Sequence, residues 1–341
     1  MKIRILVLNI NDLGGIERVA VNLLNMFKSD TKFSTQIVSL NGTTCHPDYV
    51  ILEGKNENNK LIKFIKEMDS DTIVLSLYDR FSIKLSILRK LIKYKQKFKL
   101  IACQHADYYA HRIHTRMLRF ITYNWVDAII ALTSQDANLY KKHYNNVHII
   151  PNALSFYPKN IPSFNSRNID CAVAGRLVPI KQYNHFIYLL SHFTTERHNF
   201  KIYGEGTEYG NLKAQLNNAN LNSESILVGK TDCLENELIN TKFFFVTSLR
   251  ESFSMVILEA MACGCVVISY DCPTGPRELI DNNVTGILIP LNKKEMLVEK
   301  YNWLRNNPEL CQEISNRARK HSSLFLEKDI LKKWISLFNE Q

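Results

Sequence analysis

Short apolar runs and stretches of helical periodicity alternate along the whole chain. A brief apolar run between polar loops predicts a strand, and apolar residues three or four positions apart predict a helix. We expect strands at residues 3–10, 72–77, 100–103, 128–132, 147–150, 170–174, 200–203, 225–227, 243–247 and 265–269. We expect helices at residues 16–27, 83–92, 255–263 and 324–338. This alternation predicts an α/β protein with parallel sheets and helices on both faces of each sheet.

One segment between the two halves lacks this periodicity. Residues 155–168 read SFYPKNIPSFNSRN and contain two prolines, which favours a linker. A chain of 341 residues is long enough for two domains. We therefore predict two Rossmann-like domains that face a cleft, residues 1–155 and 169–322, joined by a linker at 156–168. The last helix, within residues 323–341, could pack back onto the first domain.

The net charge of +10 is concentrated in the first half of the chain. Residues 1–150 contain 22 basic and 13 acidic residues, and residues 81–99 contain seven basic residues and no acidic one. Two interpretations of residues 81–99 stay open: a helix that binds an anionic membrane surface, or a core-packing helix with a solvated basic face. Nucleic acid is the weaker expectation, because no nucleic-acid-binding motif accompanies the charge.

Cysteine usage and apolar content bear on the cellular compartment. The eight cysteines show no CxxC pair, which favours free thiols in the cytoplasm. The first residues, MKIRILVLNINDLGG, fit a first strand better than a signal peptide, because Asn9, Asn11 and Asp12 interrupt the apolar run. No stretch approaches the roughly 18 apolar residues of a membrane span. We therefore expect a cytoplasmic protein, with the inner face of the plasma membrane as a candidate site of peripheral attachment.

Residues 243–280 contain the most informative pattern, because two carboxylates bracket a junction between a strand and a helix. Glu251 follows the strand expected at 243–247, and Glu259 lies within the helix expected at 255–263. Ligands of such βαβ units collect beyond the carboxyl ends of the strands. A carboxylate there accepts hydrogen bonds from sugar or ribose hydroxyls. Helix capping and solvent exposure are the alternative interpretation of the two glutamates.

Two cations follow the first strand expected in the second half. Arg176 and Lys181 lie five residues apart in AGRLVPIK, across a turn that contains Pro179. Cations at the carboxyl end of a strand suit a diphosphate and could stabilise the charge on a departing nucleotide. Ordinary surface charges are the alternative.

Other candidate ligands lie in the first half. Gly14 and Gly15 stand between the first strand and helix, where bare backbone can approach a ligand, although a tight turn explains them equally. His105 follows the strand expected at 100–103 and could bind a hydroxyl or relay a proton. The histidines lack a compact ligand spacing, so no metal is expected. The acidic pair at residues 69 and 71 precedes its strand, which is the wrong end for a ligand.

Together these motifs resemble the retaining glycosyltransferases of GT-B fold known as family 4. The resemblance extends over nearly the whole chain: GG at 14–15, PNAL at 151–154, AGRLVPIK at 174–181, YGEG at 203–206, VGK at 228–230 and ESFSMVILE at 251–259. The last, an E-x7-E pattern, is the most specific. Residues 272–280, CPTGPRELI, look like the variant found in bacterial enzymes that build lipopolysaccharide, capsule or related glycans.

The resemblance implies a role for each matched residue. Arg176 and Lys181 would hold the donor diphosphate, Glu251 the transferred sugar and Glu259 the ribose. His105 would lie near the reacting carbon. The remaining donor-binding residues would be Gly14, Gly15, Gly229, Lys230, Phe253, Ser254, Met255 and Val256. Ser254 departs from the glycine or proline that the family often has at this position, which puts the sugar contact in doubt.

The implied activity is transfer of a hexose or N-acetylhexosamine from a UDP-sugar to a glycan or lipid-linked acceptor, with retained anomeric configuration and without a metal or other cofactor. No residue is placed as a covalent nucleophile, so departure and attack on the same face of the sugar are expected. Two alternatives stay open: a sugar-nucleotide epimerase of the same architecture, which would lack the E-x7-E pattern, and a sugar-nucleotide-binding subunit without turnover.

Overall fold

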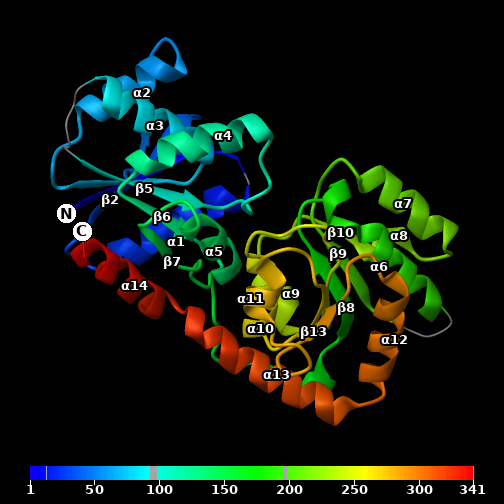
Figure 1. Ribbon diagram of the computed structural model, residues 1–341. Coiled ribbons are helices and arrows are strands. Elements are labelled where there is room, and N and C mark those ends of the chain that lie inside the picture. The colour runs from blue at the N-terminus through cyan, green and yellow to red at the C-terminus, as the bar shows by residue number, and fades with distance from the viewer. Residues whose placement is uncertain (13, 93–97, 195–197, 341) are drawn as a thin grey trace. The chain divides into compact units, whose positions relative to one another are not determined.

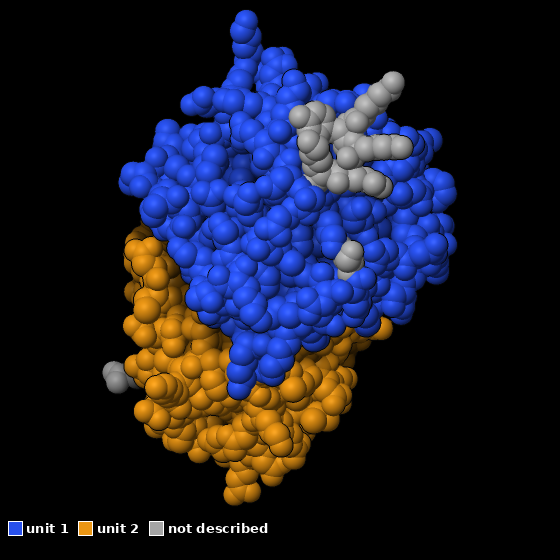
Figure 2. Space-filling view, turned by 90° about the vertical axis from the view of Figure 1, so that its left-hand side faces the viewer, with its two compact units in different colours: residues 1–153, 327–341 blue, residues 154–326 orange. Residues whose placement is uncertain are grey.

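The computed structural model describes residues 1–12, 14–92, 98–194 and 198–340. Within these ranges the chain forms two compact units, which Figure 2 shows in different colours. Unit 1 contains residues 1–153 and 327–341, and unit 2 contains residues 154–326. The segment predicted to be a linker therefore belongs to unit 2. Arg167 at its end is buried and donates hydrogen bonds to the carbonyl oxygens of Thr241 (2.9 Å) and Gly264 (2.8 Å).

The described part of unit 1 contains a parallel sheet of seven strands in the order β3-β2-β1-β4-β5-β6-β7 (Figure 1). Its strands are β1 (Lys2–Asn9), β2 (Ser34–Asn41), β3 (Tyr49–Ile51), β4 (Thr72–Ser76), β5 (Phe98–Gln104), β6 (Ala128–Ala131) and β7 (Val147–Ile149). Its helices are α1 (Gly15–Lys28), α2 (Glu57–Lys66), α3 (Asp79–Leu91), α4 (Ile113–Thr122), α5 (Ser134–Lys141) and α14 (Glu327–Glu340), with a 3-10 turn at Tyr123–Trp125.

Helices cover both faces of the unit 1 sheet. On one face, α1 and α14 pack over side chains such as Ile5 and Ile101. The ring of Phe27 on α1 lies 5.7 Å from that of Trp334 and 5.9 Å from that of Phe338, both on α14. The next side chains along the strands, such as Leu6, face α2 and α3. Such alternation is expected of strands buried on both faces. The final helix is thus part of the unit 1 core.

The sheet of unit 2 is also parallel and, in the described residues, has six strands in the order β10-β9-β8-β11-β12-β13. They are β8 (Ile169–Ala174), β9 (Phe200–Tyr203), β10 (Leu227–Gly229), β11 (Thr241–Val246), β12 (Val266–Tyr270) and β13 (Ile287–Ile289). The helices are α6 (Tyr183–Leu190), α7 (Tyr209–Asn218), α8 (Ser223–Ile226), α9 (Leu234–Ile239), α10 (Met255–Ala262), α11 (Gly275–Leu279), α12 (Lys294–Arg305) and α13 (Pro308–Ser322). Short 3-10 turns occur at Phe164–Ser166, Pro179–Lys181, Ser191–Phe193 and Ser323–Phe325.

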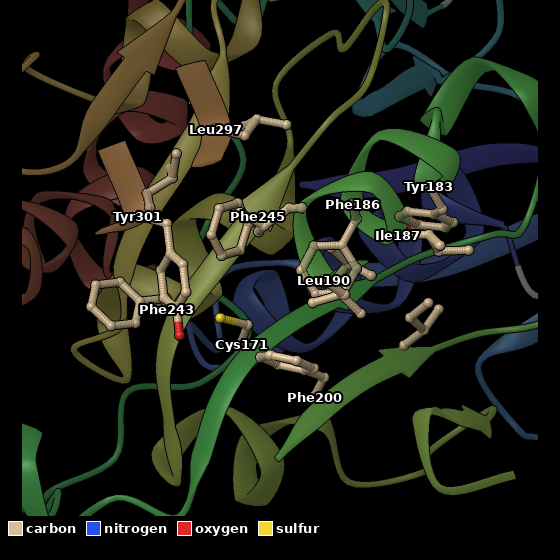
Figure 3. Close-up of a cluster of buried hydrophobic side chains, with 14 of the residues drawn as sticks. Cys171, Tyr183, Phe186, Ile187, Leu190, Phe200, Phe243, Phe245, Leu297 and Tyr301 are labelled. Carbon is tan, nitrogen blue, oxygen red and sulfur yellow. The ribbon is translucent and has the colours of Figure 1, made fainter. Parts of the chain in front are cut away.

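An aromatic-rich core joins one face of the unit 2 sheet to α6 and α12 (Figure 3). Phe243 and Phe245 point from β11 toward Tyr301 of α12, with ring centres 5.1 and 5.9 Å apart. Phe186 of α6 packs against Phe245 at 5.4 Å. Edge-to-face and tilted aromatic packing of this kind adds to the gain from buried area. The core therefore fixes β11, and with it the loop that carries Glu251.

The predicted fold class is confirmed, since both sheets are parallel, Rossmann-like and covered by helices. One of the expected strands begins later than predicted. The strand expected at 225–227 begins only at Leu227, because residues 223–226 form α8. The Asn222 side chain caps that helix by accepting hydrogen bonds from the amides of Glu224 (3.1 Å) and Ser225 (3.3 Å). Capping by asparagine favours helix over strand at this point.

The basic segment at 81–99 contributes its apolar side to the core of unit 1. Phe81, Ile83 and Leu85 on α3 are buried. Residues 93–97, which carry three of its seven basic residues, lie outside the described residues. For residues 81–92 the structure favours the core-packing interpretation over membrane binding. Among the described helices, none combines the length and apolarity needed to span a bilayer.

Candidate active site

Three loops of unit 2 meet at the carboxyl ends of neighbouring strands. Because β8, β11 and β12 are adjacent, the segments that follow them, residues 175–181, 247–254 and 271–274, lie at one edge of the sheet. Two hydrogen bonds join the first two loops. The amide of Leu249 donates to the carbonyl oxygen of Ile180 at 2.8 Å, and Thr247 Oγ1 donates to that of Lys181 at 2.8 Å. This edge is where open α/β sheets bind ligands.

Lys181 and Glu251 form an ion pair at this edge. Lys181 Nζ donates to Glu251 Oε1 at 2.7 Å, and the two side chains are only 20% and 11% exposed. Ser248 Oγ donates to the same carboxylate oxygen at 2.6 Å. The carboxylate is thus held in one orientation by two donors from different loops, as a ligand-recognising group needs to be. The sequence predicted both residues as site residues, and the structure brings them into contact.

Glycines allow the loop that carries Arg176 to pack against a second loop. Gly204 and Gly206 have φ angles of 139° and 157°, and a Cβ on either would overlap backbone atoms of Gly175 or Leu177. The amide of Leu177 also donates to the carbonyl oxygen of Glu205 at 2.8 Å. The two glycines in YGEG therefore allow their loop to pack directly against the backbone of residues 175–177. Arg176 itself is exposed.

Two non-glycine residues in the loops around Glu251 have unusual backbone geometry. Ser254, which caps α10, has a φ of 66°, and Thr274 has a φ of 73°. Thr274 forms a β-bridge with Glu251 and donates its hydroxyl to the Glu251 carbonyl oxygen. Positive φ at a β-branched residue costs about 1–3 kcal/mol and concentrates at functional sites. The backbone of Glu251 is thus held by a strained neighbour.

The predicted donor residues 253–256 lie at the start of α10. Phe253 is buried, while Met255 and Val256 are partly exposed in the first helical turn. A first turn offers backbone amides to an anion. Glu259, four residues after Met255 on the same helix, is fully buried at 0% exposure. Its predicted contact with a ribose stays a prediction.

Two buried hydroxyls in this region were not identified as a pair from the sequence. Tyr183 Oη and Ser254 Oγ are buried, and among the described residues neither has a hydrogen-bond partner. A Cβ built on Gly175 would lie 2.9 Å from Tyr183 Oη. Burial, and then the charge of Glu251, raise the pKa of Tyr183, so its hydroxyl stays protonated. Buried hydroxyls normally have partners, so these two are suited to accept or donate to a ligand.

The remaining predicted residue pair of unit 2 lies at the edge strand of the sheet. Gly229 ends β10 with a φ of 83°, and its carbonyl oxygen accepts from the Gly204 amide at 2.8 Å. Lys230 is exposed, with Nζ 3.7 Å from Asp232 Oδ1. The backbone bond places Gly229 next to the glycine loop that supports Arg176.

The predicted residues of unit 1 occupy the ends of its strands. His105 follows β5, and its Nε2 is buried without a hydrogen-bond partner among the residues that the structure describes. Burial lowers the pKa of His105 to about 4, so the ring is neutral near pH 7. Gly14 caps α1 and Gly15 is its first residue, while residue 13 of the same loop lies outside the described residues.

The acidic pair at 69 and 71 precedes β4, as expected. Asp69 Oδ2 accepts from Lys2 Nζ at 2.5 Å, and this bond, with one from Thr72, lowers the pKa of Asp69 to about 2. Asp71 lies 3.3 Å from the terminal ammonium of Met1. These carboxylates serve ion pairs at the amino ends of the strands. Across the described ranges, no group of three or more metal-ligating side chains occurs.

Comparison with known proteins assigns the class. Residues 159–321 match the family described as Glycosyl transferases group 1. The amylovoran biosynthesis glycosyltransferase AmsD of Erwinia amylovora is 23% identical over 354 residues, which cover 99% of each chain. A Campylobacter jejuni enzyme is 23% identical over 100% of this chain and 99% of its own. It is named GalNAc-alpha-(1->4)-GalNAc-alpha-(1->3)-diNAcBac-PP-undecaprenol alpha-1,4-N-acetyl-D-galactosaminyltransferase.

A solved structure shows the same fold over the whole chain. HepE from Anabaena, crystallised in complex with UDP and glucose, superimposes with a TM-score of 0.84, covers 100% of both chains and is 16% identical. The chain has the GT-B fold. The family match over residues 159–321, together with relatives over the whole chain that are named glycosyltransferases, indicates a glycosyltransferase. The resemblance found in the sequence is confirmed at that level.

Proposed function

We propose that this chain is a retaining, family 4 glycosyltransferase that moves a hexose or N-acetylhexosamine from a UDP-sugar to a glycan or lipid-linked acceptor in bacterial surface polysaccharide synthesis. The observation that carries the proposal is the 2.7 Å contact between Lys181 Nζ and Glu251 Oε1 at the carboxyl edge of a parallel sheet. It joins a phosphate-binding group to a hydroxyl-binding group. The names of AmsD and of the Campylobacter enzyme support a polysaccharide product and a lipid-linked acceptor, and the UDP bound to HepE supports a UDP donor.

The diphosphate of the donor is assigned to the two cations. Arg176 is exposed on a loop that two glycines hold in place, and Lys181 stands at the end of the same loop. Glu251 accepts a hydrogen bond from the ammonium of Lys181. A bound diphosphate would compete for that ammonium and free the carboxylate to accept hydrogen bonds from the sugar. Binding of the phosphates and recognition of the sugar would thereby be coupled.

The remaining donor contacts are those that the family resemblance implies. Gly229 and Lys230 would border the uracil, and Glu259 the ribose. Amides and side chains of residues 253–256, together with Gly14 and Gly15, would meet the sugar and phosphate. The buried hydroxyls of Tyr183 and Ser254, to which the described part of the chain offers no hydrogen-bond partner, add two further groups for the donor.

The reaction breaks the bond between the anomeric carbon and the oxygen of the β-phosphate. The electron pair stays on the diphosphate, where Arg176 and Lys181 stabilise the growing negative charge. The acceptor hydroxyl forms its bond to the anomeric carbon on the same face, and its proton passes to the departing phosphate oxygen. His105, neutral near pH 7, is suited to hydrogen-bond a sugar hydroxyl near the reacting carbon. The proposal needs no metal, because the two cations carry the charge compensation.

One experiment separates this function from its two alternatives. The protein is incubated with a panel of UDP-sugars, with and without glycan and undecaprenyl-diphosphate-linked acceptors, and free UDP and sugar configuration are measured. Acceptor-dependent release of UDP with an α-linked product from an α-linked donor supports retaining transfer. A β-linked product contradicts retention, an isomerised donor indicates an epimerase, and binding without either product indicates a binding subunit.

A further inference from the structure

Helix α4 turns its apolar side chains away from unit 1. Four large residues at helical spacing form one stripe, and a fifth lies beside it. Their exposed fractions are 71% for Ile113, 64% for Met117, 46% for Leu118, 55% for Phe120 and 54% for Ile121. A surface helix normally buries such a stripe, and a contiguous exposed apolar patch on a soluble protein marks an interaction site.

A buried polar anchor fixes α4 in this orientation. Arg119, on the opposite side of the helix, is buried and donates to Asp79 Oδ2 at 3.1 Å and to Tyr140 Oη at 2.9 Å. It also donates to the carbonyl oxygen of Tyr108 at 2.7 Å. Rolling the helix over would expose these groups and leave the Asp79 carboxylate buried without its cation, which is costly. The outward direction of the apolar stripe is thus built into the fold.

Cations surround the apolar stripe, and acidic residues are absent from its segment. Residues 108–126 contain no aspartate or glutamate. Arg112 is exposed at the start of α4, and Arg116 stacks on Tyr109 at 4.8 Å. The Phe120 ring packs 5.3 Å from that of His143, which follows the exposed Lys141 and Lys142. The surface combines apolar side chains with positive charge.

We propose that the α4 surface, defined as residues 112–121 with Lys141 and Lys142, docks on a bilayer that contains anionic lipid. The apolar stripe would enter the boundary between headgroups and acyl chains to a depth of about 5–10 Å. The flanking cations would face lipid phosphates. This inference extends the proposed lipid-linked acceptor, yet binding can be measured without any donor or acceptor, so each proposal can fail alone.

A second copy of the chain fits this surface less well. Symmetric pairing would place the same patch against itself and bring Arg112 and Lys142 close to cations of the same sign. Anionic lipid provides both the apolar layer and the opposite charge. The inference also moves the membrane contact from residues 81–92, where Phe81, Ile83 and Leu85 are buried, to α4.

The test uses the full chain and vesicle flotation. Vesicles of phosphatidylcholine with about a third phosphatidylglycerol are compared with pure phosphatidylcholine, at low and high salt. The expected result is capture by the anionic vesicles and at least about ten-fold weaker capture by the neutral ones. The double variant I113S/F120S should lower the partition coefficient about ten-fold or more, and R112Q/K142Q should weaken the preference for anionic lipid.

The control variant is Leu324→Ser, which removes a 62% exposed leucine from unit 2 and should leave capture unchanged. Circular dichroism of each variant checks that the fold is retained, which is expected because all substituted side chains are exposed.

Equal capture of wild type and I113S/F120S would overturn the proposal, as would absence of wild-type capture. If the wild type forms a dimer that the I113S/F120S substitutions abolish, and the wild type does not bind vesicles, the surface contacts a second copy of the chain instead. UDP release with a soluble glycan acceptor, measured in parallel, reports on transfer independently.

Discussion

Gly204 and Gly175 pack so closely that a Cβ on Gly204 would overlap the carbonyl oxygen of Gly175. The two glycines belong to different loops, one after β9 and one after β8. A hydrogen bond from the Gly175 amide to the Tyr203 carbonyl oxygen, at 3.0 Å, holds the loops together. The position of Arg176 therefore depends on a glycine 28 residues away in the sequence.

Replacing Gly204 by alanine should destabilise unit 2 and weaken UDP binding. The added methyl meets backbone, and φ is 139°, so a cost of about 1–3 kcal/mol is expected. Thermal unfolding and titration calorimetry with UDP measure the two effects. Gly210→Ala is the matched control, since Gly210 lies in α7 with open space around it and alanine favours helix by about 0.5–1 kcal/mol. Equal stability of both variants would contradict the packing role.

Lys181 and Glu251 should be coupled in catalysis. Lys181→Ala should lower kcat about 10²-fold, because a group that stabilises the leaving diphosphate is lost. Since the two side chains touch, K181A and E251Q together should cost less than the sum of the single effects. The surface pair Lys213 and Glu224, 2.6 Å apart, serves as a control cycle and should show no effect on kcat. Additive losses at Lys181 and Glu251 would count against a shared role.

His105 should remain neutral through the physiological range. Burial lowers its pKa to about 4 from the usual ~6.5. Between these values the unfolded chain binds a proton that the folded chain does not, so this residue's contribution to stability falls as pH decreases from about 6.5 to 4. Chemical denaturation at several pH values should show a weaker pH dependence for His105→Gln than for wild type in that window. An NMR titration midpoint of His105 near 6.5 would refute the assignment.

The buried pair of Arg119 and Asp79 should dominate the stability of the α4 region. Arg119→Met removes the buried guanidinium beside the Asp79 carboxylate, which keeps only its contacts with His111 and Tyr123, and should lower the free energy of unfolding by about 3–5 kcal/mol. The double variant R119M/D79N removes both charges and should recover part of the loss. Urea denaturation measures both. Arg317→Ala, which breaks an exposed pair with Glu313 at 2.8 Å, is the control and should cost less than about 1 kcal/mol. Equal costs for R119M and R317A would show that the pair is not structural.

Much of the fold could be predicted because strands buried on both faces of a parallel sheet are short apolar runs, which stand out in the sequence. The strand at 200–203 was placed at its observed bounds, and 72–77 and 128–132 within one residue. Strands with mixed polar content, such as Ser34–Asn41, escaped prediction. Local capping also mattered, because Asn222 turned an expected strand start into α8.

The candidate site could be predicted in part, since residues at the carboxyl ends of parallel strands converge wherever the strands are neighbours. That argument placed Lys181 and Glu251, but strand order is not written in a single sequence, so their contact could only be found in the structure. The outward face of α4 could not be predicted, because its apolar periodicity equally suits a core helix. What decides its direction is Asp79, 40 residues before Arg119.

The packing of α14 against α1 has a consequence for the order in which the chain folds during synthesis. Unit 2 is continuous in sequence, whereas unit 1 needs residues 327–340 to cover the apolar side of Phe27 and its neighbours. During synthesis, residues 1–153 leave the ribosome before residues 327–340. The apolar face that α14 covers in the folded protein therefore stays exposed to solvent while unit 2 is made. The part of the chain synthesised first is completed last.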